Sequence, residues 1–125
     1  MTYEVGRSAG LRAVHRMEGM PAPEGERHPH DYRIEVVVER GALDGRGMVI
    51  DLDILAAALE ELTGTMAGAD LDDAIPEHRG GVTVELLARW VHESLRGPVR
   101  AAGGETLAVR VFETEDAFGG FRGPT

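Results

Sequence analysis

Residues 26–39 read ERHPHDYRIEVVVE, and this stretch holds the clearest structural signal in the chain. Apolar and polar side chains alternate along it, which is typical of a strand that buries one face. The apolar parity carries Tyr32, Ile34, Val36 and Val38. We therefore predict a strand over residues 29–40. His28 and His30 stand at its start on the same parity, so both imidazoles are expected to point toward the core.

A second strand is expected on the N-terminal side, over residues 3–17, because apolar residues and one histidine alternate with polar ones there. The residues on this parity are Leu11, Ala13, His15 and Met17. The Gly/Pro-rich residues 18–27 join the two strands as a loop. After the strand over 29–40, residues 41–48 read as a turn, and Val49–Ile50 as a hairpin-like return.

Two helices are expected in the middle of the chain. Asp51 or Asp53 can cap the first, and Gly64 can end it. Thr83 can cap the second, and Gly97–Pro98 is expected to stop it. The apolar positions at helical spacing are Leu52, Leu55, Leu59 and Leu62 in the first helix and Val84, Leu87, Val91 and Leu95 in the second.

The remaining segments complete the fold prediction. Residues 67–81 read as a loop with a short turn. A last strand is expected over 104–115, paired with a short one near Pro98–Ala102, and the tail 118–125 is expected to be irregular. Strands followed by two helices and further strands suggest an α+β fold with both helices on one sheet face. We expect one domain over residues 1–125.

The composition limits the classes of partner. The formal net charge is -9 and the pI is about 4.9, which argues against nucleic acid or an anionic membrane as the main partner. The chain has no cysteine, so disulfides and thiolate chemistry are excluded. We find no apolar signal-peptide region and no apolar run near the ~18 residues of a membrane span. The expected location is the cytoplasm.

Three histidines are candidate metal ligands. His15 ends its strand on the apolar parity, as His28 and His30 begin theirs. Three neutral imidazoles suit Zn²⁺ and leave a fourth position open, which is the pattern of catalytic zinc. The alternative is that these rings only form hydrogen bonds at the strand ends. His78, in a loop, and His92, on a helix surface, look unconnected to them.

Glu113 is a second candidate site residue. It ends the core-facing row of the last strand, after Leu107, Val109 and Val111. A carboxylate in that position is costly unless it is paired. It is suited to hold two adjacent N–H donors, such as those of a pterin or guanine ring. The alternative is a frayed strand end with Glu113 in water.

Six short motifs in order, covering nearly the whole chain, give it a family resemblance. The sequence resembles the 6-pyruvoyltetrahydropterin synthase and 6-carboxytetrahydropterin synthase family, in which a zinc histidine precedes a His-Gly-His-x-Tyr motif and a Glu-Thr motif closes the series. The matching segments here are LRAVHRM, HPHDY, GRGMVIDLDIL, DLDDAI, GVTVELLARWVHESL and FETEDAF.

The resemblance implies the tunnelling fold, or T-fold, in which a four-stranded antiparallel sheet carries two helices on one face. It implies that zinc is bound by three histidines, and these fall at His15, His28 and His30. It implies that Glu113 anchors a pterin-like ring and that Thr83 lines its pocket. It further implies a homohexamer built as a dimer of trimers, with active sites between subunits.

The sequence departs from the family at the catalytic positions. The family's cysteine falls at Glu24, and the histidine of its Leu-Asp-His segment falls at Asp73, after a retained Asp72. A glutamate at the cysteine position resembles a branch that cleaves the side chain of dihydroneopterin triphosphate. We therefore expect a lyase with Glu24 as base and Asp72 and Asp73 beside it. The alternative is a zinc-containing pterin- or purine-binding homologue without turnover.

Overall fold

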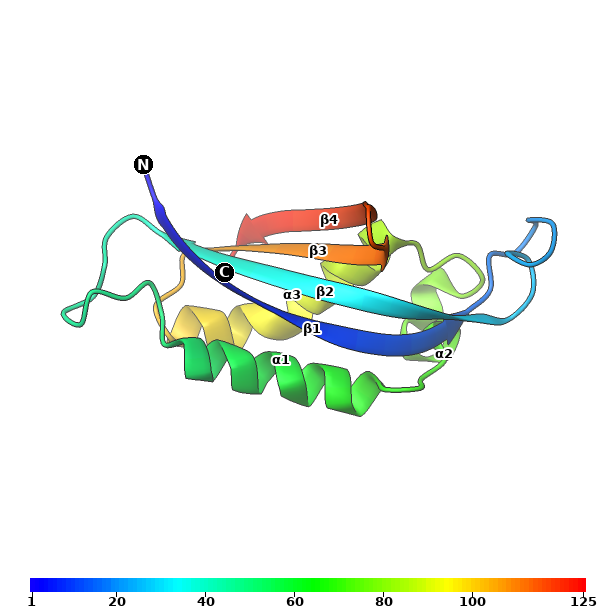
Figure 1. Cartoon of the computed structure of the whole chain (residues 1–125), viewed down its shortest axis with the longest axis horizontal. Coiled ribbons are helices and arrows are strands. Elements are labelled where there is room, and N and C mark those ends of the chain that lie inside the picture. Colours follow the sequence, from blue (N-terminus) through cyan, green and yellow to red (C-terminus); the bar gives the residue numbers. More distant parts are fainter.

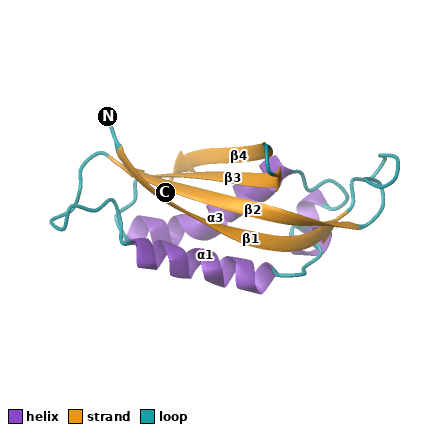
Figure 2. Ribbon diagram, viewed as in Figure 1, coloured by secondary structure: helices purple, strands orange, loops and turns teal.

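The computed structural model describes all 125 residues as one antiparallel sheet with helices on one of its faces (Figures 1 and 2). The strands are β1 (Tyr3–His15), β2 (His28–Arg40), β3 (Thr106–Thr114) and β4 (Ala117–Pro124), and they neighbour one another in chain order. The helices are α1 (Leu52–Met66), the four-residue α2 (Leu71–Ala74), the 3₁₀ turn η1 (Pro76–His78) and α3 (Val84–Ala101). The predicted four-stranded α+β architecture is confirmed.

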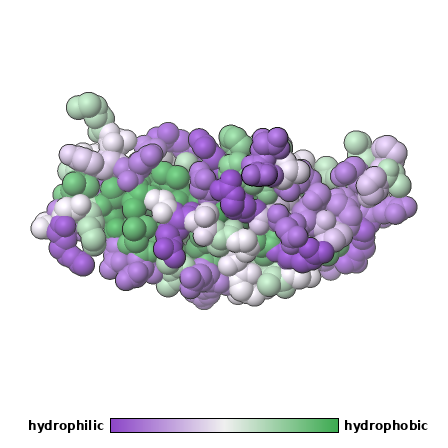
Figure 3. Space-filling view, viewed as in Figure 1, coloured by the Kyte–Doolittle hydropathy of each residue, from purple (hydrophilic) through white to green (hydrophobic).

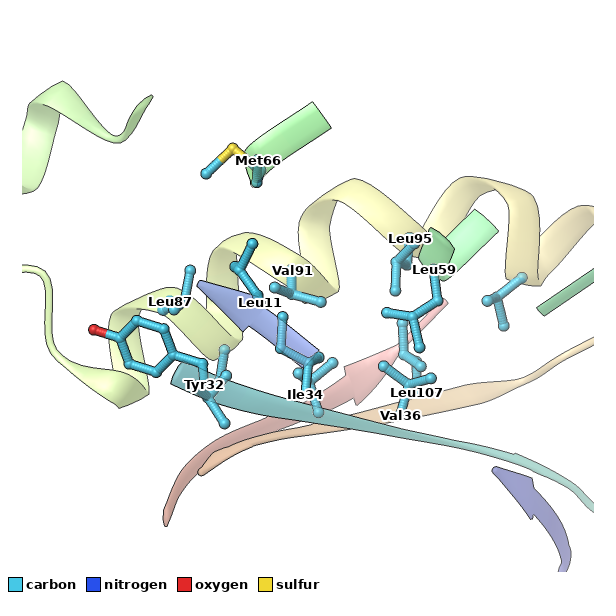
Figure 4. Packing of buried hydrophobic residues seen from close by; sticks show 14 of the residues in the cluster. Leu11, Tyr32, Ile34, Val36, Leu59, Met66, Leu87, Val91, Leu95 and Leu107 are labelled. Carbon is cyan, nitrogen blue, oxygen red and sulfur yellow. The ribbon is translucent and has the colours of Figure 1, made fainter. Parts of the chain in front are cut away.

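The core lies between one face of the sheet and the two long helices. The alternation in β2 places its apolar parity inward, and Val36 pairs with Val109 of β3 on that face. Burying a side chain of this size stabilises the fold by about 1.5–3 kcal/mol. Figure 4 shows the sheet and helix side chains meeting here, among them Ile34, Val36 and Leu107 from strands and Leu59, Val91 and Leu95 from helices.

Both long helices begin where the sequence predicts. The Asp51 carboxylate accepts a hydrogen bond from the Asp53 backbone N–H at 2.8 Å, and the Thr83 hydroxyl accepts one from the Leu86 N–H at 3.2 Å. Each cap satisfies a backbone donor that the first helical turn leaves unpaired. The predicted end of α1 at Gly64 is wrong by half a turn, since the helix continues to Met66.

The prediction for the end of α3 is wrong. The helix passes through Pro98 and ends at Ala101, so neither the stop at Gly97–Pro98 nor a strand near Pro98–Ala102 exists. Proline removes one backbone hydrogen bond from the helix, yet α3 continues past it and buries Val99 in the core. Val49 and Ile50 also form no strand; both are buried in a bend before α1.

The tail is the largest departure from the sequence prediction, because it forms the edge strand β4 rather than an irregular segment. Its glycines have a packing function. A Cβ on Gly119 would lie 2.6 Å from Cγ2 of Val84, so β4 approaches the start of α3 more closely than a side chain permits. Glycine-rich sequence therefore marks close backbone approach here.

Exposed apolar side chains are concentrated at one end of the molecule. Apolar residues gather where the start of β1, the loop 41–50 and the start of α1 meet, on the left of Figure 3. Exposed members of this apolar patch are Tyr3, Leu43, Leu52 and Ile54. No helix combines the length and the apolar character that crossing a membrane requires.

Candidate metal and ligand site

The sheet register brings three histidines together at one end of the molecule. His15 is the last residue of β1 and pairs with His28, the first residue of β2, while His30 pairs with Ala13. All three rings lie on the helix-covered side. The Nε2 atoms of His15 and His28 are 2.9 Å apart, and those of His28 and His30 are 3.0 Å apart. The predicted grouping of the three imidazoles is therefore present in the fold.

Backbone carbonyls orient two of the rings. His15 Nδ1 donates to the Val82 carbonyl at 2.9 Å, and His28 Nδ1 donates to the Glu26 carbonyl at 2.7 Å. Since a carbonyl only accepts, both neutral rings carry hydrogen on Nδ1 and turn a bare Nε2 lone pair toward the other. Two facing lone pairs repel unless a cation lies between them, and Nδ1 held by a carbonyl is typical of zinc-binding histidine.

The surroundings of His30 favour its neutral form. Burial lowers the pKa of His30 below its ordinary value, although nearby Glu113 acts in the opposite direction. The neighbouring imidazoles add to the lowering. Neutral imidazole is the form that binds a metal ion, so this electrostatic environment fits a metal site.

Two carboxylates stand beside the histidines. Glu24 Oε2 lies 3.5 Å from His28 Nε2, and Glu113 Oε1 lies 2.8 Å from His30 Nε2. Glu113 lies near the end of β3 and is paired with His30, which avoids the cost of an unpaired carboxylate. The alternative, a frayed strand end with Glu113 in water, therefore does not describe this residue. Glutamate and histidine together also form a second group of candidate metal ligands, Glu24, His30 and Glu113.

The loop 16–27 carries Glu24 to this position. The Met17 N–H donates to the Glu24 carbonyl at 2.9 Å, which folds the loop back on itself. Gly25 follows directly, and a Cβ there would overlap the Met20 carbonyl oxygen. The sequence predicts a loop here, but only the structure shows that it directs a carboxylate at the histidines.

A pocket of about 600 Å³ opens next to the cluster. Its lining includes the predicted Thr83, and also Glu85 and Thr114, which were not predicted. Glu85 could have been found from its place in the first turn of α3, two residues after the cap. The full lining is His15, Met17, Met20, Glu24, His30, Thr83, Val84, Glu85, Glu113 and Thr114.

Tyr32 supports the inner wall of the cluster. Its ring centroid lies 5.4 Å from that of His30, and its side chain is buried. Burial raises the pKa of Tyr32, and the carboxylates Glu113 and Glu24 raise it further. Tyr32 therefore remains a neutral phenol next to two acidic groups.

Asp72 and Asp73 do not line the pocket. Asp72 is buried, and its Oδ1 accepts a hydrogen bond from the Gly80 N–H at 2.9 Å. Asp73 is exposed and pairs with Arg79 at 2.8 Å. Their catalytic role, expected from the resemblance, stays a prediction.

The placement of His92 on a helix surface is wrong. The ring is 1% exposed, its Nε2 donates to the Gly123 carbonyl at 3.2 Å, and Phe121 packs edge-on against it. The error follows from the missed strand β4, which covers this side of α3. His78 lies in η1 and belongs to no metal-ligand group.

A one-sided antiparallel sheet with an imidazole cluster and two carboxylates at one end defines a small α+β protein with a candidate metal and ligand site. The 6-pyruvoyl tetrahydropterin synthase family model matches residues 4–124. The chain therefore belongs to the 6-pyruvoyl tetrahydropterin synthase family.

Solved structures share the fold at low sequence identity. 6-Pyruvoyl tetrahydropterin synthase from Caenorhabditis elegans is 21% identical with a TM-score of 0.74, over 98% of this chain and 96% of that one. A Plasmodium vivax synthase variant, with alanine in place of a catalytic glutamate, is 12% identical with a TM-score of 0.78, over 100% and 99%. An uncharacterized protein from Wolinella succinogenes is 15% identical with a TM-score of 0.76, over 97% and 98%. No curated protein matches the chain.

Proposed function

We propose that this chain is a zinc-dependent lyase that acts on the side chain of a pterin resembling dihydroneopterin triphosphate. The observation that carries the proposal is the convergence of three Nε2 atoms beside Glu24 and Glu113. His15, His28 and His30 would hold the metal, with an open side toward the pocket. When bound, zinc would polarise side-chain oxygens of the substrate and lower the cost of removing a neighbouring proton.

The part of the pocket next to Glu113 would bind the pterin ring. Glu113 would accept two hydrogen bonds from adjacent N–H groups of the pterin ring, and charge-assisted bonds of this kind are among the strongest in proteins. Thr83 would line the same region from the start of α3. The 600 Å³ pocket falls within the size range of small-ligand sites.

Glu24 is proposed as the base. It would take the proton of a side-chain hydroxyl while the adjacent carbon–carbon bond breaks, so that the departing fragment becomes an aldehyde and the electron pair of the broken bond stays on the carbon attached to the pterin ring. The protonated Glu24 would then return the proton to that carbon, which completes the hydroxymethyl group. The exposed side of its loop lets substrate reach it, and its neighbour His28 is 3.5 Å away. The Plasmodium vivax relative, whose catalytic residue is a glutamate, supports a carboxylate in this role.

The standard synthase reaction is not proposed. It depends in the family on a cysteine, and this chain has none. A thiolate is a strong nucleophile that is easily poised near neutral pH, whereas an unperturbed glutamate has a pKa of about 4.3. Asp73 also cannot replace the family's imidazole, because it is an exposed acid paired with Arg79.

A second candidate function is binding without turnover, in which the chain holds zinc and a pterin- or purine-like ligand. The loss of both the cysteine and the histidine after Leu71-Asp72 favours it. The two functions share the same site, and only product formation separates them.

The experiment is incubation of the zinc-loaded protein with dihydroneopterin triphosphate, followed by mass spectrometry of the products. Wild type is expected to give the cleaved hydroxymethyl pterin, and Glu24→Gln is expected to give none while keeping its zinc. Glu24→Cys tests whether a thiol restores standard synthase chemistry. Standard synthase product from wild type, or cleavage that survives in Glu24→Gln, contradicts the proposal. Binding without any product supports the second candidate.

Two further properties of the protein are its assembly and its location. We propose a homohexamer, made of two stacked trimers of the single domain 1–125, as the family resemblance implies. The two open sheet edges and the exposed apolar patch are surfaces that neighbouring chains could cover. We propose a cytoplasmic location, as the sequence predicts.

A further inference from the structure

No side chain of the short helix α2 forms a hydrogen bond or an ion pair with the three histidines, yet three separate connections run from this helix and its cap to them. We propose that α2 positions the metal site, and that Asp72 is a positioning residue that acts through its acceptor oxygen. The inference rests on the proposed zinc centre. It differs from the catalytic role that the family resemblance implies for this aspartate.

The first connection is to β1. The segment before α2 runs beside the end of this strand, where the Gly68 N–H donates to the Arg12 carbonyl at 2.7 Å and the Val14 N–H donates to the Ala69 carbonyl at 2.9 Å. Asp70 also forms a parallel bridge with Val14. The residue directly before His15 is therefore tied to the residue that caps α2.

The second connection runs through Asp72 to the carbonyl that orients His15. Asp72 is 7% exposed, and its Oδ1 accepts the Gly80 N–H at 2.9 Å. Gly80 has a φ of +79°, and its carbonyl accepts the Glu18 N–H at 2.7 Å, so the loop is held from both sides. Two residues later, the Val82 carbonyl holds His15 Nδ1 at 2.9 Å.

The third connection reaches His28. Asp70 Oδ1 caps α2 by accepting the Asp72 N–H at 2.9 Å, while its Oδ2 pairs with Arg27 at 2.8 Å. Arg27 stands between His28 and Glu26, whose carbonyl orients the His28 ring. The side chain of Asp70 is 13% exposed, so solvent screens this ion pair less than a pair in which both side chains are exposed, such as Arg12–Asp31.

A catalytic role and a positioning role for Asp72 require different chemical groups. A proton relay must gain and lose a proton, which requires a carboxylate. An anchor for the Gly80 N–H requires only an acceptor oxygen at the same place, and asparagine offers one. Partners that orient metal-bound histidine typically change metal affinity by 10–100-fold when they are removed.

The experiment compares zinc affinity, by chelator competition, in wild type, Asp72→Ala and Asp72→Asn. We expect Asp72→Ala to bind zinc about 10-fold more weakly, at the lower end of that range because Asp72 acts one contact beyond the Val82 carbonyl that holds His15, and Asp72→Asn to bind it within about two-fold of wild type. Asp53→Ala, which removes a carboxylate from the opposite end of the molecule, is the matched control and is expected to bind as wild type does. The visible spectrum of the Co²⁺-substituted protein should change in Asp72→Ala alone.

Two outcomes overturn the inference by itself: equal zinc affinity in Asp72→Ala and wild type, or a loss in Asp72→Asn as large as in Asp72→Ala. If Asp72→Ala does not fold, Asp72→Glu replaces it, because glutamate keeps the charge but moves the acceptor by one methylene. It is then expected to weaken zinc binding in the same way, and wild-type affinity in Asp72→Glu contradicts the inference. A wild-type chain that binds no zinc contradicts the proposed function as well.

Discussion

His30 is the residue at which the two halves of the site meet. Its Nε2 lies 3.0 Å from the Nε2 of His28 and 2.8 Å from the carboxylate of Glu113. This nitrogen can carry a hydrogen toward Glu113 or turn a lone pair toward a metal ion, but not both at once, so metal binding at His30 would leave the Glu113 carboxylate available to a ligand. At the scale of single residues, the testable properties of the site are the role of Glu113 as acceptor and the protonation of His30.

Glu113→Gln is expected to weaken binding of a neopterin or biopterin by about 2–3 kcal/mol, because one oxygen of a paired charged acceptor is replaced by a donor. Calorimetry with the zinc-loaded protein measures this. Glu115→Gln, two residues along and exposed, is the matched control and is expected to bind as wild type does. Unchanged affinity in Glu113→Gln would mean that the Glu113 carboxylate does not bind the pterin ring.

The lowered pKa of His30 gives a pH dependence of stability. Its folded pKa lies below the ordinary 6.5, so the unfolded chain binds the proton more readily. The free energy of unfolding should therefore fall as the pH drops through that value. We expect metal-free protein to unfold at lower urea concentration at about pH 5.5 than at about pH 7.5, around the usual titration range of histidine. His30→Asn should lose less stability over this range, and an equal loss in both proteins would refute the assignment.

At the scale of elements, the turn between α3 and β3 depends on a glycine for packing. A Cβ on buried Gly104 would lie 2.6 Å from Cγ1 of both Val38 and Val99. Gly104→Ala is therefore expected to lower the free energy of unfolding by about 1–3 kcal/mol, the usual cost of overpacking. Gly64→Ala, inside α1 with open space around it, should raise that free energy by about 0.5–1 kcal/mol. Urea unfolding measures both free energies, and two changes of the same sign would contradict the different packing roles given to Gly104 and Gly64.

Periodicity and capping residues predicted most elements of this fold, and the misses share one physical cause. β2 and both long helices follow from apolar spacing and from Asp51 and Thr83. Gly119 and Pro98 were misread because glycine and proline break regular structure in isolation, whereas here the packing of β4 against α3 and the burial of Val99 after Pro98 override that tendency. Such tertiary effects leave no local pattern.

The same limit applies to the site. His15, His28 and His30 share core-facing parities, so alternation predicts that all three rings face the core, and the pairing of β1 with β2 brings them together. The approach of Glu24 could not, because it depends on how an irregular loop folds back on Met17. The anchoring contact of Asp72 was also out of reach, since its partner lies eight residues away in a second loop.

At the scale of the whole molecule, the two faces of the sheet differ in chemistry. One face is covered by helices, while the other carries ion pairs such as Arg12–Asp31 and Arg122–Glu39. Exposed pairs of this kind contribute little to stability, about 0–1 kcal/mol. β1 and β4 each pair on one side only, which leaves two open edges that a neighbouring chain can cover.

For the proposed homohexamer we expect light scattering to give a mass near six times that of the chain. Ile54→Glu places a charge in the apolar patch formed by Tyr3, Leu43, Leu52 and Ile54, and should shift the mass toward smaller species. Glu60→Gln, a change of charge farther along α1, serves as control and should leave the mass unchanged. A stable wild-type monomer at micromolar concentration would remove the proposed assembly.

The order of the strands has a consequence for how the chain reaches its final form. All three histidines belong to one hairpin, β1 and β2 with the loop between them, and His15 and His28 are only 13 residues apart. A zinc ion can therefore close this hairpin as a chelate before α1 and α3 have docked, since loop closure over so short a span costs little entropy. We expect refolding from urea, followed by stopped-flow fluorescence, to be faster with zinc than with chelator, and His28→Ala to show no such difference. The metal would then act as a template for the sheet as well as a part of the finished site.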